Sequence, residues 1–125
     1  MNGFNLALKQ LGNKIGGLPV EMVVEDDGFK PEIGKQKADK LVKQDNVDVV
    51  TGLIWSHVML ASANSVLNGG KFLISANAGN SKMAGKNCHK NFFNTSWQND
   101  TVPMALGEVL NGEGVKSVYI MAPNY

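Results

Sequence analysis

Apolar residues recur at helical spacing in some segments of the chain and form nearly continuous runs in others. Residues 2–15 have apolar side chains at intervals of three, four and seven, which places them on one face of a helix. Short runs rich in valine and isoleucine, bounded by glycine and asparagine, have the features of strands. The pattern therefore predicts helices and strands that alternate along the chain.

This alternation predicts an α/β fold, because strands that alternate with helices form βαβ units around a parallel sheet. The first element is a helix with no strand before it, and no helix follows the last strand. The pattern thus resembles part of a larger doubly wound unit. The predicted elements are helix 2–15, strand 18–25, helix 31–45, strand 47–54, helix 56–67, strand 71–75, loop 76–91, an extended segment 92–97, helix 99–112 and strand 115–121.

The stretch 47–57 is the centre of this pattern. Residues 47–54 are mostly β-branched and nearly continuous, as expected for a strand covered on both faces. Ser56 then opens a helix at the carboxyl end of that strand, which is where ligands bind in open α/β sheets. The N–H groups of a helix N-terminus favour an anionic ligand. The sequence alone leaves two interpretations open: Ser56 binds such a ligand, or it only caps the helix.

Composition and charge exclude several classes of protein. The chain has 125 residues and a net charge of +1, so it is of single-domain length and has no electrostatic footprint for nucleic acid. The lysines of residues 35–43 lie on a predicted helix beside acidic residues, as on a solvated face. No apolar run is long enough to span a bilayer. Met1 leads directly into the amphipathic pattern, so we expect no signal peptide within this sequence.

Neither cysteine nor histidine indicates a catalytic or metal site. Cys88 is the single cysteine, so no disulfide forms within the chain. Lys86, His89 and Lys90 could lower the pKa of its thiol, but no triad surrounds it. His57 and His89 have no partners at ligand spacing, so we expect no metal.

A nucleotide cofactor is not expected either. Asp26 and Asp27 stand at the end of the predicted second strand, where a dinucleotide fold binds a ribose hydroxyl. No G-x-G-x-x-G precedes the first helix, so the phosphate half of that fingerprint is absent. We therefore predict no cofactor.

Six phrases in register resemble a known family. They resemble the extracellular solute-binding proteins of branched-chain amino acid type ABC importers, whose fold is the type I periplasmic binding protein. This resemblance implies one lobe of a three-layer αβα fold with a parallel sheet, whose first strand is missing. It assigns residues 1–114 to a partial amino-terminal ligand-binding lobe and 115–125 to the first strand of a second lobe. The phrases are residues 3–8, 25–27, 52–56, 74–79, 92–100 and 118–125.

The resemblance also implies a binding site. In the family, a serine at the position of Ser56 binds the ligand's carboxylate, and the backbone at Ala78 and Gly79 binds its carboxylate and ammonium. The family usually has threonine or serine where this chain has Gly79. Either Ser81 supplies that hydroxyl, or the ligand lacks the group that needs it, which makes an α-amino acid doubtful. The expected ligand-binding residues are Ile54, Trp55, Ser56, Asn77, Ala78 and Gly79.

The two tryptophans are interpreted differently. Trp55 is either a contact at the floor of the cleft or a core residue, and both interpretations stay open. For Trp97, near the crossover between lobes, we expect a packing role.

By resemblance, the chain is the periplasmic or extracellular solute-binding component of an ABC importer. It would bind a branched-chain amino acid or an aromatic or other organic acid and deliver it to a membrane permease, without catalysis. The alternatives are a ligand-sensing receptor domain of the same fold and a flavodoxin-like enzyme. Because the expected sheet lacks a central strand, we also expect exposed edges and self-association of this chain.

Overall fold

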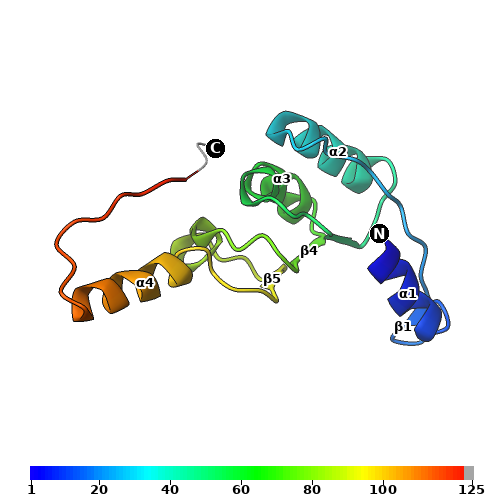
Figure 1. Cartoon of the computed structure of the whole chain (residues 1–125). Coiled ribbons are helices and arrows are strands. Elements are labelled where there is room, and N and C mark those ends of the chain that lie inside the picture. The colour runs from blue at the N-terminus through cyan, green and yellow to red at the C-terminus, as the bar shows by residue number, and fades with distance from the viewer. Residues whose placement is uncertain (123–125) are drawn as a thin grey trace.

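A three-stranded parallel sheet is the centre of the molecule. The structure is a computed structural model, which describes residues 1–122 apart from the side chain of Lys86. The strands are β3 (Val49–Thr51), β4 (Phe72–Ser75) and β5 (Phe92–Asn94), in the order β3-β4-β5 (Figure 1). Both pairs are parallel, with Val50 opposite Leu73 and Leu73 opposite Phe92.

Two helices cover one face of this sheet. Helices α2 (Pro31–Lys43) and α3 (Ser56–Asn68) pack against each other, and Figure 1 shows them together on one side of β4. Because side chains alternate along a strand, Val50 and Leu73 face the helices and are buried. The core combines small and branched residues of both layers: Ala38, Val42, Val50, Met59, Ala63, Val66, Leu67, Leu73, Ala78 and Met83.

A glycine lets the two helices approach closely. Gly34 lies inside α2 and is buried. A Cβ at this position would lie 2.5 Å from Cγ1 of Val58, which is fully buried in α3. The contact between α2 and α3 therefore depends on the missing side chain, because a well-packed core resists added volume.

The opposite face of the sheet is uncovered. Val49, Phe72 and Phe93 are each between 44% and 49% exposed. The expectation that strand 47–54 is buried on both faces is therefore wrong for this chain. The strand is also shorter than predicted, and Ile54 beyond it is 59% exposed.

The amino-terminal region differs from the prediction. Helix α1 (Asn2–Gln10) ends before residue 15, because Gly12 and Asn13 take positive φ values of 64° and 56°. A two-residue hairpin follows, formed by β1 (Lys14–Ile15) and β2 (Leu18–Pro19). Of the predicted strand 18–25, only β2 forms, and residues 20–27 belong to no strand. A strand needs a neighbouring strand for its hydrogen bonds. Val20 still donates to the carbonyl of Asn13, but among the described residues no strand lies beside 21–27.

An ion-pair cluster ties this irregular segment to α2. The carboxylate of Glu25 lies 2.6 Å from Lys37 Nζ and also contacts Lys40, which in turn lies 3.2 Å from Asp45. The hydrogen bonds from Lys37 and Lys40 hold the pKa of Glu25 below its ordinary value. The bond to Glu25 correspondingly raises the pKa of Lys40.

The carboxyl-terminal third contains one further helix. Two 3₁₀ turns, η1 (Ser81–Met83) and η2 (Gly85–Asn87), interrupt the predicted loop 76–91. Helix α4 (Thr101–Gly112) follows β5 and extends away from the sheet (Figure 1). The predicted strand 115–121 is not formed, since residues 115–122 have no neighbouring strand to pair with. Residues 123–125 of the predicted second-lobe segment lie outside the described residues.

The architecture confirms the predicted fold class. A parallel sheet in the order β3-β4-β5 with helices on one face corresponds to two of the layers of a three-layer αβα fold. Among residues 1–122, no helix has the length and apolar character that a membrane crossing requires.

Candidate binding site

Three loops meet at the carboxyl edge of the sheet. Because β3, β4 and β5 are parallel, the segments that follow them lie at the same edge. The side-chain amide of Asn77, after β4, donates to the carbonyl of Ile54, after β3, at 2.8 Å. The backbone N–H of Asn99, after β5, donates to the carbonyl of Gly79 at 2.8 Å. These bonds join the three loops to one another.

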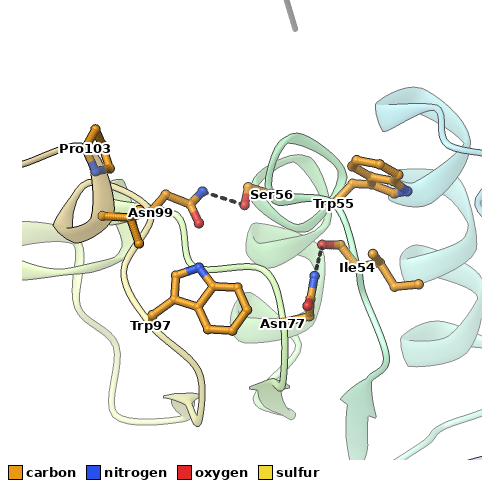
Figure 2. Close-up of a pocket in the computed structure, with 8 residues that line it drawn as sticks. Ile54, Trp55, Ser56, Asn77, Trp97, Asn99 and Pro103 are labelled. Carbon is orange, nitrogen blue, oxygen red and sulfur yellow. Dashed lines mark hydrogen bonds between the residues drawn. The ribbon is translucent and has the colours of Figure 1, made fainter. Parts of the chain in front are cut away.

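Ser56 stands at the junction of these loops. It is the first residue of α3 and is half-buried, while Trp55 occupies the N-cap position without a side-chain capping bond. The interpretation of Ser56 as a helix N-cap is therefore wrong. Instead, its hydroxyl oxygen accepts a 2.8 Å hydrogen bond from Asn99 Nδ2 (Figure 2). The hydroxyl therefore contacts the loop after β5.

An open pocket of about 610 Å³ lies between these loops. Figure 2 shows the side chains of Ser56 and Asn99 pointing toward each other, with the Trp97 indole beside them. The pocket is lined by Ile54, Trp55, Ser56, Asn77, Trp97, Asn99, Val102 and Pro103.

The lining suits a small anion with an apolar part. The N-terminus of α3 at Ser56 carries the positive end of the helix dipole. The hydroxyl and the two amide side chains supply neutral hydrogen-bonding groups, while the indole and the aliphatic side chains supply apolar surface. The arrangement can therefore hold a carboxylate at the helix end and an apolar group against Trp97.

Trp55 is held at the pocket by aromatic contacts. Its ring meets the edge of Phe29 at a centroid distance of 4.5 Å, and Phe29 meets His57 at 5.0 Å. Trp55 is 41% exposed, so it is not a core residue. Figure 2 shows its indole on the other side of Ser56 from Trp97.

The structure brings four of the six expected site residues together at the pocket. Ile54, Trp55, Ser56 and Asn77 line it. Ala78 and Gly79 are buried and do not line it. The carbonyl of Ala78 accepts from the Ser75 hydroxyl at 2.6 Å, and the carbonyl of Gly79 accepts from Asn99. Ser81, the candidate replacement for a hydroxyl at position 79, is not among the lining residues either.

Sequence reasoning missed the wall that comes from the loop after β5. Trp97 was expected to pack, but it is 59% exposed and faces the pocket. The sequence predicts a helix over 99–112, but α4 begins at Thr101 with Asp100 at the N-cap position, so Asn99 lies in the loop before the helix. The predicted topology could have identified this wall. Loops that follow successive parallel strands lie at one edge of the sheet, so polar and aromatic residues after the third strand are expected near those after the first two.

The remaining chemically distinctive residues lie apart from this pocket. Cys88 is exposed and not in a disulfide. The ring nitrogen Nδ1 of His89 accepts from the backbone of Asn91 at 3.1 Å. Among the residues that the structure describes, no three His, Cys, Asp or Glu side chains are grouped to hold a metal ion.

Comparison with known proteins agrees with the fold. A family model for periplasmic binding proteins matches residues 1–125, so the chain belongs to the periplasmic binding protein family. This confirms the resemblance found in the sequence, and the neighbouring solved structures have the type I fold. No curated protein matches the chain.

Three solved structures illustrate the similarity. A solute-binding protein of an ABC transporter from R. palustris in complex with benzoate is 29% identical, with a TM-score of 0.81 over 91% of this chain and 32% of its own. A second R. palustris solute-binding protein, in complex with 4-hydroxybenzoate, is 26% identical, with a TM-score of 0.72 over 90% and 30%. A branched-chain amino acid transporter substrate-binding protein from Streptococcus pneumoniae with isoleucine is 23% identical, with a TM-score of 0.72 over 87% and 32%, and shows the fold alone. The chain therefore spans less than a third of the length of these proteins.

Proposed function

We propose that this chain contributes one wall of the ligand cleft in the solute-binding component of an ABC importer. The observation that carries the proposal is the position of Ser56. It stands at the N-terminus of α3, borders the pocket and holds its hydroxyl among the loops after β3 and β5. A hydroxyl and a helix N-terminus together are suited to a carboxylate. The backbone of Ala78 and Gly79 remains part of the proposed site.

The proposed ligand is a small organic acid with an apolar or aromatic body. The indole of Trp97 offers a flat apolar surface beside Ser56 (Figure 2). Gly79 stands where the family usually has a hydroxyl, and the described residues that line the pocket include no carboxylate to pair with an ammonium. The benzoate and 4-hydroxybenzoate complexes of the two R. palustris relatives support an aromatic carboxylate over a branched-chain amino acid.

The proposed role is binding without bond chemistry. The lining consists of hydroxyl, amide, indole and aliphatic side chains, which bind and orient a ligand and are poorly suited to acid–base catalysis. Family membership supports delivery of the ligand to a membrane permease and a periplasmic or extracellular location. The expected mechanism is closure of two lobes over the ligand, with hinges at the crossovers between them.

Chain 1–125 by itself would supply only one side of this cleft. We therefore expect weak or no ligand binding by the isolated chain, and exposed sheet edges that favour self-association. Ligand binding should therefore be measured with a form of the protein that has both lobes.

Replacing Ser56 with alanine tests the proposed function. Loss of a hydrogen bond to a charged group should weaken carboxylate binding by ~1–3 kcal/mol. A thermal-shift panel of aromatic acids and branched-chain amino acids identifies the probe, and calorimetry then measures its affinity. Ser65→Ala, further along α3 and away from this pocket, is the matched control. Unchanged affinity after Ser56→Ala, or no carboxylate binding by the unaltered protein, would refute the proposal.

A further inference from the structure

The loop after β5 lies unusually close to Gly79. A Cβ at Gly79 would overlap the carbonyl oxygen of Trp97, and it would lie only 3.0 Å from Asn99 Oδ1. Gly79 is buried, so a side chain there could not turn toward solvent. The segment 97–99 can therefore pack against residue 79 only because glycine has no side chain.

That close approach brings Asn99 to Ser56. The backbone N–H of Asn99 donates to the carbonyl of Gly79 at 2.8 Å, which fixes the start of the side chain. Its amide then reaches the Ser56 hydroxyl, with Nδ2 donating to Oγ at 2.8 Å (Figure 2). The amide of Asn99 therefore occupies the space next to Gly79 where a hydroxyl side chain would project.

The direction of this hydrogen bond determines what Ser56 can offer a ligand. A serine hydroxyl has one proton and two lone pairs. The bond from Asn99 uses a lone pair, which leaves the proton free to be donated elsewhere. Ser56 borders the pocket, so its hydroxyl can donate to an acceptor located there.

We propose that Asn99 is a positioning residue that makes Ser56 a hydrogen-bond donor to a carboxylate, and that Gly79 is required for Asn99 to reach it. This inference rests on the proposed function and extends it with a determinant of charge selectivity. The neutral amide of Asn99 adds no negative charge beside the ligand, and its second amide proton points away from the bond to Ser56.

The replacement Asn99→Asp tests this directly. Aspartate has nearly the same shape, but its carboxylate only accepts hydrogen bonds. Ser56 would then donate its hydrogen bond to residue 99, and the proton would no longer be available to the ligand. The added negative charge would also repel a carboxylate. We expect benzoate binding to weaken about 10- to 100-fold at neutral pH, because a like charge beside the ligand's carboxylate repels it.

The pH dependence of benzoate binding distinguishes a positioning role of Asn99 from a purely structural one. Protonation of the new carboxyl restores a donor toward Ser56 and removes the charge. Benzoate bound beside the new carboxyl favours its protonated form. Binding to Asn99→Asp should therefore strengthen as the pH is lowered within the range above the pKa of benzoic acid, where the ligand stays charged. It should also be accompanied by proton uptake, measured by calorimetry in buffers of different ionisation enthalpy. The unaltered protein should show neither effect above the pKa of benzoic acid.

Asn94→Asp is the matched control. Asn94 ends β5, and its side chain accepts from the backbone N–H of Ser96 at 2.9 Å, a bond that aspartate also makes. This variant introduces the same charge on the same segment without contacting Ser56. We expect its benzoate affinity to change less than that of Asn99→Asp.

Gly79→Ser tests the second half of the inference. Its Cβ displaces the segment 97–99, so the bond between Asn99 and Ser56 is lost and benzoate binding weakens. Gly107→Ala, at a helix position where a Cβ meets nothing within 4 Å, is the control. Thermal unfolding of each variant separates loss of the site from loss of the fold.

The outcomes distinguish the inference from the proposed function. If the unaltered protein binds benzoate or another carboxylate and Asn99→Asp binds it equally well, the inference is wrong and the proposed function stands. If the unaltered protein binds no carboxylate of the panel, the proposed function fails, and the inference fails with it. Weakened binding by Asn99→Asp that recovers at lower pH, with the control unaffected, supports both.

Discussion

At the scale of the residue, the site depends on side chains from three loops that are far apart in the sequence. Ser56 follows β3, Asn77 follows β4, and Trp97 and Asn99 follow β5. Each position could be recognised as the end of a predicted strand. The contacts between these side chains could not be predicted. The bond between Asn99 and Ser56 spans 43 residues and depends on the close approach at Gly79.

Trp97 gives a prediction at this scale. Its indole is exposed on the pocket wall, so an aromatic ligand can stack on it. In a form with both lobes, Trp97→Leu should weaken benzoate binding by about 0.5–1.5 kcal/mol, the range for an aromatic pair beyond its buried area. Calorimetry with benzoate and with an aliphatic acid of similar size measures the effect.

The aliphatic acid serves as the control ligand, because it gains nothing from ring stacking. Trp97→Phe keeps an aromatic face and should retain most of the affinity for benzoate. Equal losses for both ligands with Trp97→Leu would mean that Trp97 acts only by shaping the pocket.

At the scale of the element, helices were easier to predict than strands. The hydrophobic period located α2 and α3 to within two residues at each end, because a helix satisfies its own backbone. Strands 18–25 and 115–121 were predicted from equally good patterns and are largely absent. Their hydrogen bonds need partner strands, which the described residues do not supply.

The cluster at Glu25 gives a prediction at this scale. The pKa of Glu25 is lowered in the folded chain, so its contribution to stability is present above the ordinary glutamate pKa and is lost as the pH falls through the lowered value. The raised pKa of Lys40 means that the contribution is also lost at strongly alkaline pH. Glu25→Gln should therefore lower the unfolding midpoint at neutral pH and have little effect in acid.

Thermal unfolding across a pH series measures this difference, with Glu21→Gln as the control because Glu21 is exposed and in none of these ion pairs. A difference between Glu25→Gln and the unaltered chain that stayed constant from neutral to acid pH would contradict the ion-pair explanation.

At the scale of the whole molecule, the sheet has one covered and one open face. Helices α2 and α3 cover one face, whereas Val49, Phe72 and Phe93 on the other remain exposed. The strand order also leaves β3 and β5 at the edges of the sheet. Open edges and an exposed apolar face both favour association with another chain.

Chain 1–125 should therefore self-associate. Sedimentation velocity should show dimers or larger species whose proportion rises with concentration. Val49→Lys puts a charge on the open face at the β3 edge and should shift the chain toward monomer. Gln36→Lys adds the same charge on the exposed side of α2 and should not. A clean monomer for the unaltered chain would disprove the prediction.

The sequence by itself determined the α/β class, the positions of α2 and α3, and the place of Ser56 at the start of a helix after a strand, because periodicity and turn chemistry are local properties. Its resemblance to solute-binding proteins of ABC importers is confirmed by the family match. Only the tertiary structure decided which strands form and which residues line the pocket. Strand pairing and the contact of Asn99 with Ser56 are interactions between distant segments, and no local pattern specifies them.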